Sequence, residues 1–206
     1  MKKQVTIASV KATGGYLKQK DEHMDGAVSA EKYHTYEEWL ELDNGERTEL
    51  YDGVIYMLAE PSSNHQAVLM ELSRQLANFL LGKPCRVYPA PFGVRLYDNK
   101  DTVFQPDISV ICDPSKITKR GCVGAPDFII EILSSSTSRY DRFVKFHDYQ
   151  RAGVREYWIA DPDDKIVTAH VFKGAACDTK VYADTDIAPV QVLPGCGIDL
   201  SLAFRD

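Results

Sequence analysis

Residues 104–111 read FQPDISVI and residues 128–133 read FIIEIL. Each apolar run predicts a buried β-strand, and each contains one acid, Asp107 in the first and Glu131 in the second. An ionised carboxylate is costly to bury among Ile, Val and Phe side chains unless a cation compensates for its lost hydration. Two such acids on consecutive strands therefore indicate a shared divalent-metal site, around which we expect the chain to be organised.

Strand parity describes how these two acids could meet. Side chains alternate between the faces of a strand, so Asp107 shares a face with Ser109, and Glu131 shares a face with Leu133. If the strands pair in register, both carboxylates converge at one face of the sheet. Carboxylates and water, without His or Cys ligands, suit a hard octahedral ion such as Mg²⁺ or Mn²⁺. Such an ion polarises a phosphoryl oxygen and activates water, so the pattern predicts phosphodiester hydrolysis.

The sequence on either side of these strands predicts the other elements of an α/β fold. Asp52-Gly53 between two strand-like runs indicates a two-residue hairpin, which places Glu49 on its first arm. Apolar residues at three- and four-residue spacing predict an amphipathic helix near residues 66–81, and a second helix near residues 139–152 is expected to end before Gly153. Further strands are expected at about residues 86–97, 103–112, 155–160 and 165–172.

The length and composition are those of an ordinary globular domain: 206 residues, 44% hydrophobic and 26% charged. Residues 1–30 show no sustained periodicity, so we expect a poorly ordered or weakly packed N-terminal arm followed by a single domain over residues 31–206. No apolar run approaches the roughly 20 residues that span a bilayer, and the N-terminus lacks a signal-peptide pattern. We therefore expect a cytoplasmic protein without membrane contact.

The net charge and the cysteine content further narrow the possible kinds of partner and of structural site. The net charge of -6 argues against broad nonspecific nucleic-acid binding, although it is compatible with a local basic groove. The cysteines are odd in number, widely spaced and lack a Cys-x-x-Cys pair, so neither a structural zinc site nor a disulfide framework is expected. They are Cys85, Cys112, Cys122, Cys177 and Cys196.

Lys145 lies in the helix predicted after the second acidic strand. A lysine beside the attacking water would orient that water and stabilise the charge that develops in the transition state, and Lys145 is the candidate for this role. The alternative is a surface ion pair between Asp141 and Lys145 at i,i+4, which would contribute only about 0.2–0.5 kcal/mol.

Several short motifs together resemble one family. Pro106-Asp107 is followed by Glu131 on the next strand, by SSSTSRYD at residues 134–141, by Lys145 and by GVREYWIADP at residues 153–162. This pattern resembles the Uma-type family of "putative restriction endonucleases", in the PD-(D/E)xK nuclease superfamily, over about residues 33–173. The resemblance implies a restriction-endonuclease-like α/β fold, with a mixed central sheet flanked by helices, and Mg²⁺-dependent (or Mn²⁺-dependent) hydrolysis of DNA.

The resemblance also implies roles for individual residues. Asp107 and Glu131 would bind the metal, and Glu49 matches the upstream acid that completes the site. The general superfamily pattern has a lysine two residues after the second acid, where this chain has Leu133. The family resemblance implies that Lys145 supplies the lysine from the following helix instead.

Alternatives exist for two of these assignments. Pro126-Asp127 is a second Pro-Asp pair, but Asp127 lies on the same strand as Glu131, so Asp107 is the preferred metal ligand. Glu49 could instead pair with an arginine such as Arg47 on a solvated strand. His65, in the first turn of a predicted helix, is either structural or helps to shape the site.

For the whole protein, the resemblance implies DNA as the partner and a homodimer, since duplex cleavage needs two sites. The predicted activity is that of an endonuclease with an activated water and no covalent intermediate. The alternatives are a noncatalytic DNA-binding or interaction protein that retains the nuclease fold, and a nuclease that acts on RNA.

Overall fold

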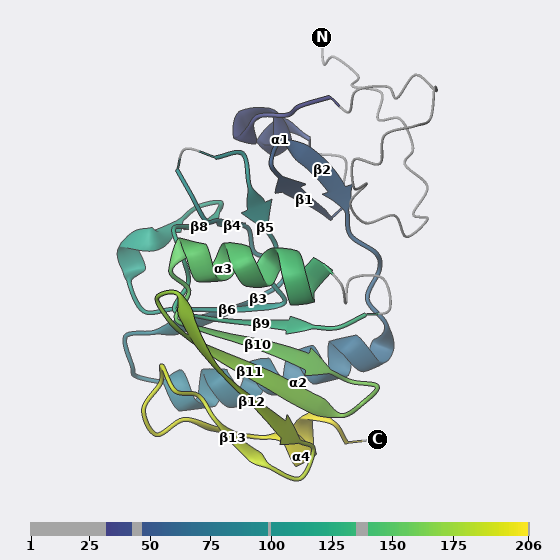
Figure 1. Ribbon diagram of the computed structural model, residues 1–206, viewed down its shortest axis with the longest axis vertical. Coiled ribbons are helices and arrows are strands. Elements are labelled where there is room, and N and C mark those ends of the chain that lie inside the picture. Colours follow the sequence, from purple (N-terminus) through teal and green to yellow (C-terminus); the bar gives the residue numbers. More distant parts are fainter. Residues whose placement is uncertain (1–31, 43–46, 99, 135–139, 206) are drawn as a thin grey trace. The chain divides into compact units, whose positions relative to one another are not determined.

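Two six-stranded sheets, rather than one central sheet, carry most of the strands (Figure 1). The structure, a computed structural model, describes residues 32–42, 47–98, 100–134 and 140–205. These residues all belong to one unit, Glu31–Asp206. The arm expected at residues 1–30 lies outside the described residues.

The first sheet contains the hairpin that was predicted around Asp52-Gly53. Its strand order is β2-β1-β5-β4-β8-β7. Asp52 and Gly53 have φ values of 49° and 76°, the left-handed conformation that a tight two-residue turn requires. The strands are β1 (Thr48–Tyr51), β2 (Val54–Met57), β4 (Val94–Arg95), β5 (Val103–Phe104), β7 (Ile117–Thr118) and β8 (Gly121–Val123).

The second sheet contains both of the acidic strands. Its order is β12-β11-β10-β9-β6-β3, in which β9 and β10 are parallel and the other neighbours are antiparallel. A small two-stranded sheet, β13 (Ile187–Pro189) with β14 (Gly197–Asp199), follows in the chain. The strands of the second sheet are β3 (Arg86–Pro89), β6 (Ile108–Ile111), β9 (Phe128–Ile132), β10 (Glu156–Asp161), β11 (Ile166–Lys173) and β12 (Ala176–Ala183).

Two of the predicted strands are each divided between the sheets. The strand expected at residues 86–97 becomes β3 in the second sheet and β4 in the first, and the strand expected at 103–112 becomes β5 in the first and β6 in the second. Pro91 lies in the first break and Pro106 in the second. Because proline has no N–H to donate to a strand ladder, each chain segment leaves its sheet near that residue.

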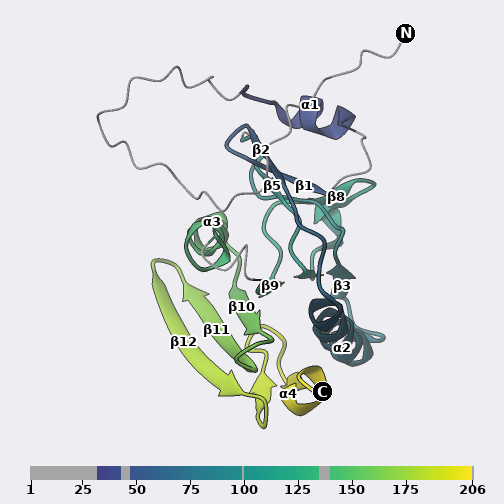
Figure 2. The same cartoon turned by 90° about the vertical axis from the view of Figure 1, so that its right-hand side faces the viewer.

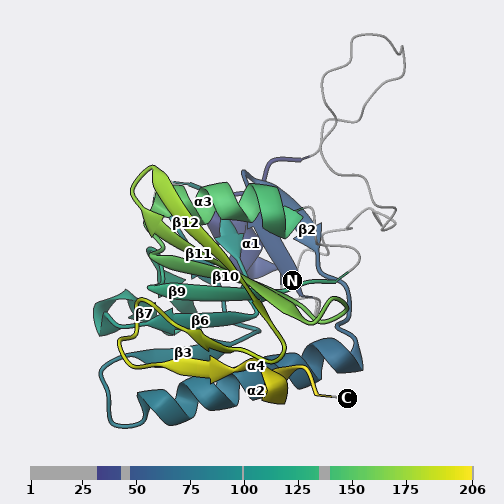
Figure 3. The ribbon, with the colours of Figure 1, turned by 60° about the horizontal axis from the view of Figure 1, so that its bottom comes forward.

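Helices cover both faces of the second sheet. Helix α2 (Ser63–Leu80) buries Val68, Leu72 and Leu76 against one face, in a core that includes Ile130. Figure 3 shows α3 (Phe146–Ala152) on the opposite side of this sheet from α2. The helices predicted at 66–81 and 139–152 are thus confirmed, except that the described part of the second begins as a π-helix, η2 (Tyr140–Lys145).

Short helices complete the fold: α1 (Tyr36–Glu41), the 3-10 helix η1 (Pro114–Lys116) and α4 (Leu200–Ala203). Helix α1 begins with a capping box, because the Thr35 side chain accepts from Glu38 N and the Glu38 side chain accepts from Thr35 N. In the ranges that the structure describes, no helix is long and apolar enough to cross a lipid bilayer.

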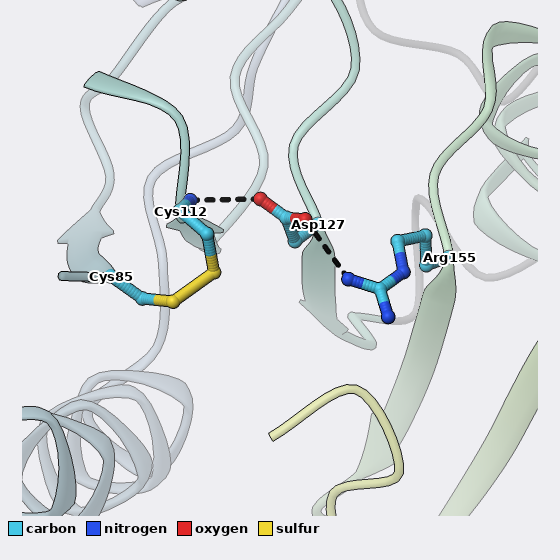
Figure 4. Close-up of a disulfide and its surroundings, with 4 residues drawn as sticks. All are labelled: Cys85, Cys112, Asp127 and Arg155. Carbon is cyan, nitrogen blue, oxygen red and sulfur yellow. Dashed lines mark hydrogen bonds and ion pairs between the residues drawn. A yellow bond between two sulfur atoms is a disulfide. The ribbon is translucent and has the colours of Figure 1, made fainter. Parts of the chain in front are cut away.

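Cys85 and Cys112 form a disulfide, although no disulfide framework was expected from the cysteine pattern (Figure 4). Strands β3 and β6 pair with Arg86 opposite Ile111, so the two cysteines lie beside each other just beyond this pair. The cysteines are 27 residues apart in sequence, and the pairing of distant strands is what brings them together. Cys122, Cys177 and Cys196 are free thiols.

We expect Cys85→Ser to lower the free energy of unfolding by about 3 kcal/mol, because the bridge closes a long loop and restricts the unfolded chain. Urea titrations under non-reducing conditions would measure the loss, with Cys177→Ser as the control that removes a free thiol. Equal unfolding midpoints for Cys85→Ser and wild type would show that the bridge contributes nothing.

Candidate active site

The ammonium group of Lys145 lies buried among three carboxylates. Its Nζ is 3.0 Å from Glu49 Oε1, 2.9 Å from Glu131 Oε1 and 3.4 Å from Asp141 Oδ1. The side chain of Lys145 is 5% exposed, and those of the three acids are no more than 4% exposed. The surface pair of Asp141 and Lys145 considered from sequence is therefore wrong, since both groups are buried.

The chain crossing between the two sheets positions Glu49. After β5, Gln105 no longer contributes its N–H to a strand ladder, and it donates this N–H to Glu49 Oε1 at 2.8 Å. The Gln105 side-chain amide donates to the carbonyl oxygen of Thr48 at 3.0 Å. Figure 2 shows β1, β2 and β5 together in the first sheet, from which Glu49 reaches the lysine.

Glu131 lies on β9 of the second sheet, and Asp107 immediately precedes the neighbouring strand β6. The last pair between β6 and β9 joins Ile108 to Ile130, so continuing this antiparallel register by one step sets Asp107 opposite Glu131. Asp107 Oδ2 also accepts from the N–H of Ile132 at 2.8 Å. The face opposite to the α2 core therefore carries both acids, as strand parity predicted.

The π-helix η2 brings Lys145 to these acids. Its buried residues are Tyr140, Asp141 and Lys145. A π-helix is rare, occurs mostly as a single turn within an α-helix, and is frequent at functional sites. Helix α3 follows directly and ends at Gly153, whose φ of 96° suits a glycine C-cap.

Two further residues contact the acids: Tyr149, which was given no role from sequence, and His65, whose role was left open. The Tyr149 hydroxyl donates to Glu131 Oε1 at 2.7 Å, and Tyr149 follows Lys145 by four residues, so the helical spacing could have indicated that they share a face. His65 Nε2 lies 3.2 Å from Asp107 Oδ2. No local pattern could have revealed that contact, because it joins residues far apart in the chain.

Electrostatics favour the charged form of Lys145. Burial alone lowers the pKa of this amine, but the attraction of Glu131, Glu49 and Asp141 outweighs it and raises the pKa well above the usual value. Burial raises the pKa of Glu131, and the nearby Lys145 ammonium opposes that shift. Because Nζ contacts two glutamates at once, one ammonium is shared by an excess of buried carboxylates.

The competing assignments lie elsewhere in the structure. Asp127 accepts a hydrogen bond from the N–H of Cys112 at 2.8 Å, and it lies 3.3 Å from Arg155 Nη1. It therefore connects Cys112, just after β6, with Arg155, just before β10, beside the disulfide (Figure 4). Glu49 forms its ion pair with Lys145 rather than with an arginine. Leu133 is buried, and the lysine that contacts Glu131 comes from η2.

The donor chemistry of the site fits a hard divalent ion. Hydrogen-bond donors approach one oxygen of each acid: Oε1 of Glu49, Oε1 of Glu131 and Oδ2 of Asp107. Glu49 Oε2 is buried without a hydrogen-bond partner, and carboxylate oxygens are the ligands that Mg²⁺ and Mn²⁺ prefer. Within the described ranges, no group of three or more His, Cys, Asp or Glu side chains is already placed to hold a metal; Glu49 and Glu131 converge on Lys145 instead.

Relatives exist among cyanobacterial proteins. The chain is 32% identical over 114 residues to the "Uncharacterized protein slr1290" of Synechocystis sp. (strain ATCC 27184 / PCC 6803 / Kazusa), which covers 55% of this chain and 59% of that relative. It is 27% identical over 139 residues to the "Uncharacterized protein sll1609" of the same organism, covering 65% and 78%.

A solved structure shares the fold. The crystal structure of "a putative nuclease belonging to DUF820" from Anabaena variabilis ATCC 29413 superposes with a TM-score of 0.67 and 23% identity, over 82% of this chain and 97% of that chain. The restriction-endonuclease-like α/β class predicted from sequence is confirmed, with the strands divided into two mixed sheets. Residues 30–203 match the profile of the Uma2 family, described as "Putative restriction endonuclease". The chain therefore belongs to the Uma2 family.

Proposed function

We propose that this protein is a metal-dependent endonuclease that hydrolyses DNA phosphodiester bonds by an activated water, with Mg²⁺ or Mn²⁺ as the cofactor. The observation that carries the proposal is the buried Lys145 ammonium between Glu49 and Glu131, with a further acid, Asp107, just before the strand that neighbours the Glu131 strand. Family membership and the nuclease-like fold support the same class of reaction.

Each residue has a role that follows from its contacts. Asp107 and Glu131 would hold the ion, and the unpaired Oε2 of Glu49 would support it directly or through water. The bound ion would supply Lewis-acid polarisation of the phosphoryl oxygen and activation of the attacking water. Lys145 orients that water and the scissile phosphate, and its charge stabilises the negative charge that grows in the transition state. Tyr149 fixes Glu131 by donating to Oε1.

The proposal includes a homodimer, because hydrolysis of both strands of a duplex needs two such sites, and a cytoplasmic location, where DNA is accessible. Its rivals are a noncatalytic protein with the same fold and a nuclease that acts on RNA. In the first experiment, cleavage of RNA alone would favour the second rival, and cleavage of neither nucleic acid would favour the first.

Supercoiled plasmid should be nicked or linearised by the purified protein in Mg²⁺ or Mn²⁺, and neither EDTA-treated protein nor Glu131→Ala should cleave it. Gel electrophoresis of the plasmid, with a labelled RNA of mixed sequence in a parallel tube, gives the readout. Cleavage of the RNA, with the DNA left intact, would show that the protein is a ribonuclease rather than a deoxyribonuclease. Cleavage that persists in Glu131→Ala would indicate a contaminating nuclease and contradict the proposed site.

A further inference from the structure

His65 touches the candidate site from an element that the reaction scheme leaves out. Its Nε2 lies 3.2 Å from Asp107 Oδ2, and both side chains are about nine-tenths buried, with exposed fractions of 10% and 11%. The N–H of Ile132 reaches the same oxygen at 2.8 Å. Two donors from different elements, α2 and β9, therefore meet at one oxygen of Asp107.

The ring of His65 is held by a rigid support. The Ser62 hydroxyl caps helix α2 by accepting from the backbone N–H of His65 at 3.1 Å, which fixes the first turn. The helix is 18 residues long, and its buried face packs in the main core. The backbone from which the imidazole extends is thus fixed by the cap and the core, independently of Asp107.

The hydrogen bonds of the ring point to a role directed at Asp107. A carboxylate only accepts, so the nitrogen that faces it carries the hydrogen, and Nε2–H donates to Oδ2. The other nitrogen, Nδ1, is buried without a hydrogen-bond partner. A buried polar atom that is left unpaired destabilises the fold, so packing alone gives no reason for histidine at this position. The contact with Asp107 provides such a reason.

We propose that His65 is a positioning residue that orients the Asp107 carboxylate for a divalent cation, so that Oδ2 stays with its protein donors and Oδ1 faces the ion. This inference rests on the proposed metal-dependent function. A single donor leaves a carboxylate free to turn about its Cβ–Cγ bond, whereas two donors from different directions fix its plane. Partners of this kind, outside the ligand shell itself, typically change metal affinity by about 10- to 100-fold when they are removed.

The test measures Mn²⁺ affinity by isothermal titration calorimetry, apart from any cleavage. His65→Leu removes the donor and puts an apolar side chain of similar size in its place, and His65→Gln keeps an N–H near the position of Nε2. We expect His65→Leu to weaken Mn²⁺ binding about 10- to 100-fold and His65→Gln to stay within about threefold of wild type. His147→Gln, which alters an exposed histidine on α3, is the control.

The outcomes separate the two proposals. If wild type binds no Mn²⁺, the proposed metal-dependent function fails and the inference fails with it. If wild type binds Mn²⁺ and His65→Leu binds it equally well, or if His65→Gln loses as much affinity as His65→Leu, the positioning role alone is overturned. His65→Asn, whose amide is too short to reach Asp107, replaces His65→Leu if the latter does not fold, and the same expectation applies to it.

Discussion

Lys145→Ala should cleave plasmid about 100- to 1,000-fold more slowly than wild type, the usual cost of removing one group that stabilises transition-state charge. The variant should also unfold more easily without metal. Lys145 is the shared partner of Glu49 and Glu131, and removing one member of a buried ion pair typically costs about 3–5 kcal/mol, because the other charge stays buried and unpaired.

Metal should reverse part of this loss of stability. The alanine variant retains the proposed metal ligands Glu49, Asp107 and Glu131 and gains space where the lysine side chain was. Mn²⁺ should therefore bind the variant more tightly than it binds wild type. Mn²⁺ should therefore raise its melting temperature by more than it raises that of wild type. Differential scanning fluorimetry with and without Mn²⁺, beside the plasmid assay, measures both effects. Lys119→Ala, at an exposed position in the loop between β7 and β8, is the matched control.

The pH dependence of stability follows from the raised pKa of Lys145. A lysine with a higher pKa in the folded state than in the unfolded chain stabilises the fold fully below the ordinary value of about 10.4. This contribution disappears only as the pH rises through the folded-state pKa. The stability difference between wild type and Lys145→Ala should therefore persist at neutral pH.

In the plasmid assay, full cleavage by Lys145→Ala would exclude Lys145 from the mechanism.

Asp107→Asn should abolish the metal response of the protein. The asparagine side-chain oxygen can keep the hydrogen bonds from Ile132 and His65, which places the side-chain NH₂ group where the second carboxylate oxygen would face the ion. This NH₂ group carries no negative charge, and it donates hydrogen bonds rather than accepting them. Plasmid cleavage should fall by at least about 100-fold, an effect comparable with the loss of a positioned charge in other active sites.

Thermal unfolding compares the stabilisation of wild type and of Asp107→Asn by Mn²⁺ most directly. At a Mn²⁺ concentration 100 times its dissociation constant, wild type should gain about 2.7 kcal/mol of stability, and Asp107→Asn should gain almost none at that concentration. Without metal, the variant should be as stable as wild type or more stable, because it buries one charge fewer. Asp163→Asn, at an exposed turn, is the control. Unchanged Mn²⁺ affinity in Asp107→Asn would exclude Asp107 as a ligand.

The sequence predicted those parts of the site that depend on local periodicity. The alternation of residues along a strand is enough to place Asp107 and Glu131 on corresponding faces, and helical spacing is enough to locate α2 and the segment that bears Lys145. The Asp-Gly turn likewise placed Glu49 on a hairpin arm. These inferences use only neighbours within one element, so distant contacts do not affect them.

The parts that sequence did not predict are contacts between distant elements. Hydrophobic alternation does not say which sheet a strand joins, so the division of β5 from β6 at Pro106 was missed, although proline was a visible signal. The contact of His65 with Asp107 spans 42 residues. The disulfide likewise depends on the pairing of β3 with β6, which no cysteine spacing reveals.

The redox state of the Cys85–Cys112 disulfide must be known before measurements on different protein preparations are compared. Strand β6 has Asp107 immediately before it and Cys112 immediately after it, so one short strand joins the bridge to the acid. Protein expressed in a reducing compartment, or assayed in a buffer with dithiothreitol, would lack the bridge that ties down one end of this strand. Thiol titration of the unfolded chain distinguishes the two batches, because the oxidised form has three free thiols and the reduced form has five.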